Sequence, residues 1–176
     1  MRLIWVDLET TGLDPISNEV LEVAVAEADL LNPFNIKFIY QAVMKFQTPI
    51  ERLDPFILNM HTKNGLLEEC FGPNAKVLSE VDQELSQLIE WVENKDERAT
   101  LAGSSIHFDH DFIKTHMPLV NKKLSHRHYD VSAIKLFCQS MRMPKFKKAE
   151  AHRAKNDIIE SVAHAQECAE WLKQNL

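Results

Sequence analysis

The first ten residues place two carboxylates at the end of an apolar, β-prone segment. Arg2–Leu8 is short, rich in β-formers and followed by Thr-Thr-Gly, which indicates a buried strand that ends in a turn. Asp7 and Glu9 are two positions apart, so a strand would place both side chains on the same face. Like charges this close repel unless a cation neutralises them, although both residues could also be solvated beyond the strand.

Further strand and helix patterns define the class of fold. Two more strands are predicted over 18–28 and 36–46, the last after a turn at Asn32-Pro33, and a short one over 100–104. Apolar residues at helical spacing predict helices over 55–61, 75–92, 108–116, 131–143 and 154–172. Strands that come first, with one returning between helices, predict an α/β fold in which a mixed sheet is flanked by helices.

Length and composition predict a single globular domain over residues 1–176. The chain has 45% hydrophobic and 26% charged residues, close to the globular average, and no segment typical of a signal peptide or a membrane helix. The three cysteines are too few and scattered for a disulfide scaffold, so we expect free thiols, a cytoplasmic location and no association with membranes.

The net charge of −6 disfavours a protein that holds nucleic acid by charge alone. It does not disfavour an enzyme whose carboxylates hold metal ions, because bound cations reverse the local sign.

Three more residues are candidates for chemistry. Asp109 follows the predicted strand over 100–104, where it could be a helix N-cap, and Asp111 is a rival for either role. His152 and Asp157 would lie just before and within the first turns of the helix over 154–172, so both side chains could point to one place. Alone, His152 could equally be an exposed loop histidine.

Taken together, these motifs resemble the DEDDh 3′→5′ exonuclease superfamily. They are Asp7-Leu-Glu9-Thr-Thr-Gly-Leu-Asp-Pro, Phe108-Asp109-x-x-Phe112 and His152-x-x-x-x-Asp157, in that order. The resemblance covers nearly the whole chain and implies a ribonuclease-H-like, five-stranded mixed sheet.

Within the superfamily the chain looks most like the oligoribonuclease group. The stretches that carry this likeness are Leu3–Glu9, His61-Thr-x-x-Gly-Leu, Tyr129-Asp-Val-Ser132 and His152-Arg-Ala with Asp157-Ile-x-Glu-Ser-Val162. The chain departs from the group at several places: Phe56 stands near the family's tryptophan, His126 replaces a tyrosine of the family's dimer interface, and Phe108-Asp109-x-x-Phe112 looks more like proofreading exonucleases.

The resemblance implies a two-metal phosphodiester hydrolase that releases 5′-nucleoside monophosphates. Asp7, Glu9, Asp109 and Asp157 would hold two Mg²⁺ or Mn²⁺ ions, since hard oxygen ligands select these metals, and His152 would be the general base. Family positions that contact a short single-stranded RNA are matched here by Leu13, Phe56, Ser105, Arg127 and Ser132. A basic stretch around His152, from Arg142 to Lys155, could steer the RNA backbone.

Two other functions stay open at this stage. The same site could serve a DNA-directed 3′→5′ exonuclease of proofreading or repair type, with single-stranded DNA as substrate. The fold could also carry a dead site in a binding or scaffold protein, against which the intact acids and His152 argue. The resemblance leaves a homodimer open.

Overall fold

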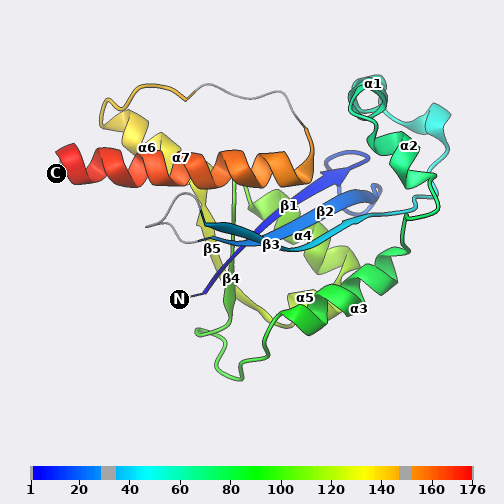
Figure 1. Ribbon diagram of the computed structural model, residues 1–176, viewed down its shortest axis with the longest axis horizontal. Helices are drawn as coiled ribbons and strands as arrows, with labels where there is room; N and C mark the ends of the chain where they lie inside the picture. Colours follow the sequence, from blue (N-terminus) through cyan, green and yellow to red (C-terminus); the bar gives the residue numbers. More distant parts are fainter. Residues whose placement is uncertain (1, 29–34, 147–151, 176) are drawn as a thin grey trace.

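A five-stranded mixed sheet organises the chain (Figure 1). The computed structural model describes residues 2–28, 35–146 and 152–175. The strand order is β3-β2-β1-β4-β5. Strands β1, β2 and β3 form the expected antiparallel meander, whereas β4 runs parallel to β1 and β5 parallel to β4. The strands are β1 (Leu3–Thr10), β2 (Val20–Ala28), β3 (Ile36–Val43), β4 (Ala99–Gly103) and β5 (Leu124–Asp130). The expected mixed five-stranded sheet is confirmed.

Helices cover both faces and one end of the sheet. Figure 1 shows α6 and α7 on one face, α3, α4 and α5 on the other, and α1 and α2 beyond the end of β1. The helices are α1 (Pro55–Lys63), α2 (Leu66–Cys70), α3 (Leu78–Leu88), α4 (His107–His116), α5 (Pro118–Asn121), α6 (Val131–Ser140) and α7 (Ala154–Asn175), with a 3₁₀ turn at Ile50–Arg52.

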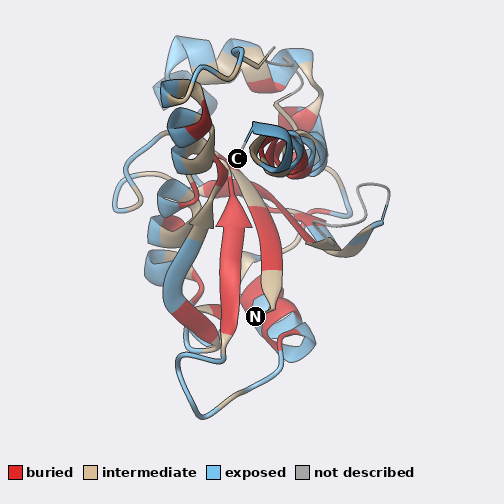
Figure 2. Cartoon of the chain, turned by 90° about the vertical axis from the view of Figure 1, so that its left-hand side faces the viewer, coloured by how far each residue is buried: buried red, intermediate tan, exposed pale blue. Residues whose placement is uncertain are grey.

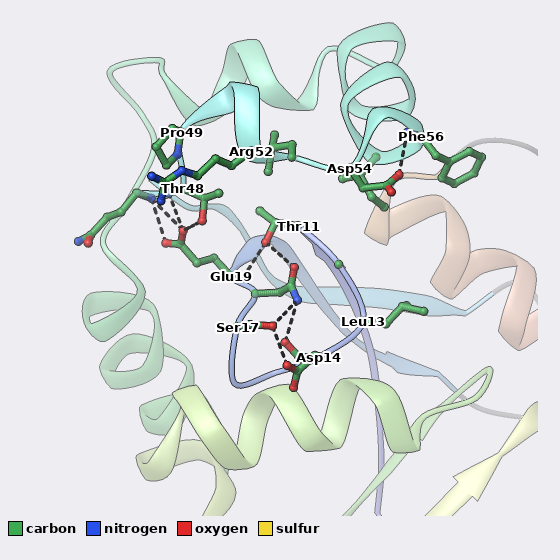
Figure 3. A pocket seen from close by; sticks show the side chains of 15 residues that line it. Thr11, Leu13, Asp14, Ser17, Glu19, Thr48, Pro49, Arg52, Asp54 and Phe56 are labelled. Atoms are coloured by element: carbon green, nitrogen blue, oxygen red, sulfur yellow. Dashed lines mark hydrogen bonds between the residues drawn. The ribbon is translucent and has the colours of Figure 1, made fainter.

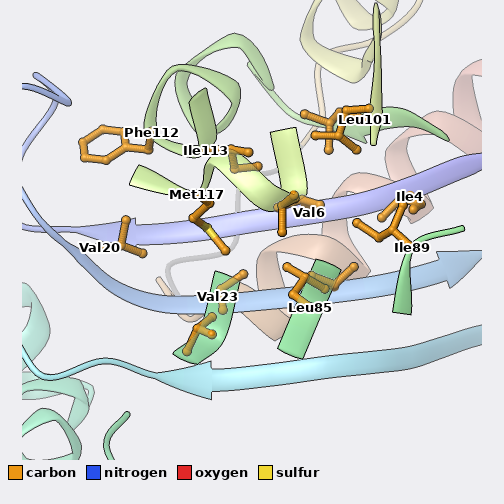
Figure 4. Close-up of a cluster of buried hydrophobic side chains, with 14 of the residues drawn as sticks. Ile4, Val6, Val20, Val23, Leu85, Ile89, Leu101, Phe112, Ile113 and Met117 are labelled. Atoms are coloured by element: carbon orange, nitrogen blue, oxygen red, sulfur yellow. The ribbon is translucent and has the colours of Figure 1, made fainter. Parts of the chain in front are cut away.

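Alternation along β1 divides the core into two layers. Ile4 and Val6 pack with Leu85 and Ile113 beneath the sheet, a cluster shown in Figure 4. Trp5 points the other way, into the cluster that contains Ile158 of α7. Because the period is two, Asp7 and Glu9 lie on the face of Trp5, toward α7. Figure 2 shows how completely the central strands are buried, which fixes this register.

The helix predicted over 75–92 is shorter at both ends. Lys76 pairs with β3 instead: its N–H donates to Val43 O at 2.9 Å and its carbonyl accepts from Lys45 N at 2.8 Å. At the other end Ile89 is extended, and Lys123 donates to its carbonyl at 2.7 Å. Contacts with other parts of the chain therefore overrode the apolar periodicity.

The fifth strand that the expected sheet requires is β5, which carries mostly polar residues because it is the last strand of the sheet. The short helices α2 and α5 were not foreseen, because they gave no periodic signal. Strand β3 ends at Val43 rather than Phe46, and α6 ends at Ser140 rather than Met143. The turn predicted at Asn32-Pro33 lies outside the described residues. Every helix in the described part of the chain is too short or too polar to span a bilayer.

Candidate active site

Three of the predicted acids meet at the end of β1. Asp7 and Glu9 project from the strand toward α7, whose first turn carries Asp157. One carboxylate oxygen from each of the three lies within 4.8 Å of the others. The strand's two-residue period and the docking of α7 thus bring together residues that are far apart in the sequence.

The fourth acid, Asp109, lies beside this cluster in the first turn of α4. Its Oδ1 accepts a hydrogen bond from the Leu8 backbone N–H at 2.8 Å, which fixes the carboxylate against β1. Asp109 and Asp7 line one cavity of about 170 Å³. The side chain bonds to a neighbouring strand rather than capping its own helix, which is the alternative that its sequence position left open.

Burial, together with mutual repulsion, raises the pKa of three of the four acids. Burial raises the pKa of Asp7 well above its usual range, and the charges of Asp109, Asp157 and Glu9 add to the effect. Burial, Asp157 and Glu22 raise the pKa of Glu9 to about 8. Burial also raises the pKa of Asp109 to about 7, although the Leu8 N–H opposes this. A convergent set of hard oxygen donors with this much unbalanced charge fits a divalent cation.

His152 faces the same acids from the loop before α7. It lines a cavity of about 410 Å³ together with Asp7 and Asp157. Its backbone φ is +40°, in the left-handed region that non-glycine residues rarely adopt. The Asn64 side-chain amide donates to the His152 carbonyl at 2.6 Å. The histidine is therefore held at the site rather than solvated in a free loop.

Two of the predicted substrate residues meet in this cavity and one lies elsewhere. The hydroxyls of Ser105 and Ser132 are 3.0 Å apart, and both line the cavity of His152. Arg127 pairs instead with Asp96, with Nη2 to Oδ1 at 3.2 Å, and does not line that cavity.

A lysine that the sequence analysis missed lines the same cavity. Lys135 lies one helical turn after Ser132 on α6, and its ammonium is 3.2 Å from His164 Nδ1. The i,i+3 spacing from Ser132 was the available signal, because it places both side chains on one helix face.

Leu13 and Phe56 project into solvent on opposite sides of a groove of about 1160 Å³ (Figure 3). Their exposed fractions are 74% and 67%, unusual for large apolar side chains. Leu13 also lines the small cavity that holds Asp7 and Asp109. Both predicted base contacts thus have open apolar surface on one groove, and Leu13 joins this groove to the acidic site.

Hydrogen bonds hold the two walls of this groove in place. Glu19 accepts from the backbone N–H of Gln47 at 2.9 Å and of Thr48 at 2.7 Å, and so fixes the segment that leads to Phe56. On the other wall the Asn18 amide donates to the Asp14 carbonyl at 3.0 Å. A Cβ on Gly12 would lie 2.2 Å from Asn18 Oδ1, so a larger residue here would displace the Asn18 side chain from its contacts in this turn.

His61 is buried next to the acids. Its side chain is completely buried, and neither ring nitrogen has a hydrogen-bond partner within the described residues. Nε2 lies 3.8 Å from Glu9 Oε2. Burial lowers the pKa of His61, and the Thr10 carbonyl opposes this without reaching hydrogen-bond geometry. The structure thus places this motif histidine against Glu9.

The basic stretch around His152 contains one residue with a different use from the one expected. Arg153 is bound to Glu22 and Glu69, so it is not free to steer a nucleic acid. Lys147 and Lys148 lie outside the described residues.

Glu22, the partner of Arg153, was not singled out from the sequence. A charged residue in the middle of the apolar run over 20–26 was the signal, because fully buried glutamates are rare unless they are paired.

The known sequences that this chain resembles are those of exonucleases. Residues 4–164 match a family model described as an exonuclease. The chain is 33% identical over 168 residues to a probable oligoribonuclease of Schizosaccharomyces pombe, covering 93% of this chain and 66% of that protein. It is 36% identical over 169 residues to an oligoribonuclease of Corynebacterium diphtheriae, covering 92% and 78% respectively. For an oligoribonuclease of Vibrio cholerae, the identity is 30% over 172 residues, covering 94% and 92%.

Solved structures share the fold. Exonuclease I of E. coli in complex with a dT13 oligonucleotide superimposes with a TM-score of 0.68 at 13% identity. The alignment covers 98% of this chain but only 42% of that one. The chain therefore spans about two fifths of the exonuclease I chain, and the likeness extends to the fold alone.

Proposed function

The chain belongs to the RNase T exonuclease family, and from that premise we propose that it is a metal-dependent 3′→5′ exoribonuclease of short oligoribonucleotides. The observation that carries the proposal is the convergence of Asp7, Glu9 and Asp157 within 4.8 Å, next to the cavity lined by His152. The relatives named oligoribonuclease, which align over most of this chain, support short RNA as the substrate class.

The four acids are the residues that would hold divalent cations, with Mg²⁺ or Mn²⁺ favoured by the all-oxygen donor set. Bound there, two such ions would supply an activated water and charge neutralisation at the leaving 3′-oxygen. By holding the ions, the acids would set where the scissile phosphate binds. Asp109 is held rigidly by the Leu8 N–H, so its carboxylate requires little reorganisation on binding.

His152 is the general base of the proposed reaction. Its imidazole would take the proton of the attacking water, since a neutral imidazole accepts protons near neutral pH. The water oxygen forms a bond to phosphorus as the bond from phosphorus to the 3′-oxygen of the upstream nucleotide breaks. That 3′-oxygen takes up a proton, and the phosphorus stays bonded to the 5′-oxygen of the released nucleotide. The product is a 5′-nucleoside monophosphate.

The remaining cavity residues would hold the substrate. Leu13 and Phe56 offer exposed apolar surface on which bases can stack or wedge. Ser105 and Ser132 offer neighbouring hydroxyls to a phosphate, with the Lys135 ammonium in the same cavity. Arg127 is the fifth predicted contact, and its present pairing with Asp96 would have to break for it to act there.

Location and assembly complete the proposal. Cys70, Cys138 and Cys168 are free and buried, which supports a reducing, cytoplasmic environment.

Strand β5 is the last strand of the sheet and exposes His126, Arg127 and His128, which supports pairing of two chains along this edge. Light scattering coupled to size exclusion tests the homodimer.

One assay tests the substrate class. A 5′-labelled RNA dinucleotide, an RNA 5-mer, an RNA 20-mer and a DNA 20-mer are incubated with the enzyme and Mg²⁺ or Mn²⁺. We expect the highest kcat/KM on the shortest RNAs and no turnover in chelator. Equal rates on the DNA 20-mer and the RNA dinucleotide would favour the DNA-directed alternative, and no turnover of any substrate would favour a dead site.

A further inference from the structure

The backbone of His152 is held by the side chain of Asn64. The Asn64 amide donates to the His152 carbonyl, while Asn64 Oδ1 accepts from the Leu66 N–H at 3.1 Å. Asn64 therefore ties the turn between α1 and α2 to the loop before α7. The bond to the carbonyl is short and joins residues 88 positions apart, so it restrains the loop from outside.

The residue after His152 is fixed even more firmly. The Arg153 guanidinium donates to both Glu22 oxygens, at 3.0 and 3.1 Å, and to both Glu69 oxygens, at 2.9 Å each. Glu22 is fully buried and also accepts from the Ala154 N–H at 3.1 Å. Three consecutive residues, His152, Arg153 and Ala154, are thus each held by a bond to another element.

We call the hydrogen bonds of Asn64 to His152, and of Arg153 and Ala154 to Glu22, the clamp. The clamp stabilises the positive φ of His152, which the loop would otherwise avoid. A non-glycine residue with positive φ costs on the order of 1–3 kcal/mol and persists where its surroundings impose it. Glu22 pairs directly with Glu9 across β1 and β2. The clamp therefore joins the strand pair that presents the acids to the loop that presents the imidazole.

We propose that Asn64 and the Glu22–Arg153 pair are positioning residues that hold the His152 imidazole toward the acidic cluster. The inference rests on the proposed role of His152 as general base. A bidentate arginine–carboxylate pair has a defined geometry, so it can set orientation as well as stability. Loss of either contact frees the loop to relax from its left-handed conformation, and the base moves away from the attacking water.

The test compares Asn64→Ala with Asn94→Ala in the full chain. Asn94 makes the same kind of turn, with Oδ1 accepting from the N–H two residues on at 3.1 Å, but lies in the loop before β4. With the best RNA substrate from the assay above, we expect Asn64→Ala to lower kcat by roughly 10- to 100-fold and to leave KM within about twofold. Asn94→Ala should match wild type.

Two further variants separate positioning from folding. Asn64→Asp keeps the acceptor for the Leu66 N–H but loses the donor to the His152 carbonyl, so it should lower kcat while the melting temperature stays near wild type. Arg153→Lys keeps the charge but cannot grip two carboxylates at once, and it should show the same loss. A loss of kcat that disappears at a temperature well below each variant's melting point would overturn the inference.

A double-mutant cycle with His152→Ala distinguishes failure of this inference from failure of the proposed function. If Asn64 acts through the imidazole, Asn64→Ala should lower kcat by less than about twofold in the His152→Ala background. An equal loss in both backgrounds, or full kcat in Asn64→Ala, would overturn the clamp and leave the proposed function standing. Full activity of His152→Ala alone would instead remove the proposed base, and the clamp with it.

Discussion

Glu9 and Glu22 lie opposite each other on β1 and β2, yet the hydrogen bonds of Arg153 go to Glu22. Glu22 is thereby neutralised within the core, whereas Glu9 shares its surroundings with Asp7 and Asp157. Two neighbouring glutamates of one sheet thus have different surroundings: Glu22 is paired with the arginine that follows His152, and Glu9 is one of the acids proposed to hold a cation.

Replacing Asp7 with Asn should separate activity from stability. The change removes a proposed metal ligand and one negative charge, so we expect activity to fall by at least about 10²-fold. In chelator the variant should be as stable as wild type or more so, because repulsion with Asp109 and Asp157 is relieved. Asp111→Asn, an exposed change on α4, is the control for both measurements. Full activity of Asp7→Asn would remove the metal assignment.

Without metal, stability should fall as the pH rises. The pKa of Glu9 is raised to about 8 and that of Asp109 to about 7, so the folded state binds more protons than the unfolded state above pH 4. Their contribution to the free energy of unfolding is therefore fully present below the pKa values of the unfolded state, near pH 4. It is lost as the pH rises through the folded-state pKa values of about 7 and 8. Each group contributes a slope of at most about 1.4 kcal/mol per pH unit.

Urea unfolding from pH 5 to 8.5 measures this effect. In chelator the free energy of unfolding should decrease with pH, and the decrease should shrink in Asp7→Asn. Saturating Mg²⁺ should flatten it, because the ion replaces the protons in offsetting the charge. A free energy that rises with pH in chelator would mean that the acids are not buried together.

His152→Ala should show the signature of a lost base. We expect kcat to fall by about 10²- to 10⁴-fold, with little change in the Mn²⁺ concentration that gives half the maximal rate. Excess Mn²⁺ should not restore the rate. Rescue by metal, together with a shifted metal dependence, would make His152 a ligand or a neighbour of one, and His61 or His110 would be tested next.

Substitutions of Lys135 and Arg127 test which cation serves the substrate phosphate. Lys135→Ala should raise KM for a 5′-phosphorylated RNA dinucleotide by about 10-fold, because one phosphate supplies much of the binding of so small a substrate. Arg127→Ala should have a smaller effect, since Arg127 is paired with Asp96. The difference should vanish for a dinucleotide without the 5′-phosphate. A larger effect of Arg127→Ala would show that its ion pair opens on binding.

Leu13 can be compared with Ile16 in the same turn. Both side chains are exposed, at 74% and 87%, but of the two only Leu13 lines the cavities described here. Leu13→Ala should raise KM several-fold through loss of about 1 kcal/mol of apolar contact with a base, whereas Ile16→Ala should not. Equal kinetics for the two variants would exclude Leu13 from the substrate site.

The strands and the long helices could be predicted because their patterns are local. Alternation in Leu3–Thr10 placed Asp7 and Glu9 on one face, as observed. The bounds of α3 could not be predicted, because the backbone of Lys76 is occupied by β3, which lies over thirty residues earlier.

Dependence on tertiary contacts also explains why the partners of Arg153 and Arg127 at the site could not be predicted. Arg153 reads as one of several cations near His152, and only the fold shows that its partner is Glu22. Arg127 matched a family position, yet its pairing with Asp96 depends on how the loop before β4 packs against β5. A pattern along the chain can identify acids and a base, but the partners that orient them come from tertiary contacts.

The contacts that fix the acids and the base span most of the chain. Asp109 bonds to Leu8 across 101 positions, and Arg153 bonds to Glu22 across 131. During synthesis, β1 leaves the ribosome long before α7 exists, so a growing chain carries Asp7 and Glu9 without Asp157 or His152. Non-local contacts of this kind form late in folding. A nascent or truncated chain should therefore be inert toward RNA, and hydrolysis would begin only once the last helix has docked.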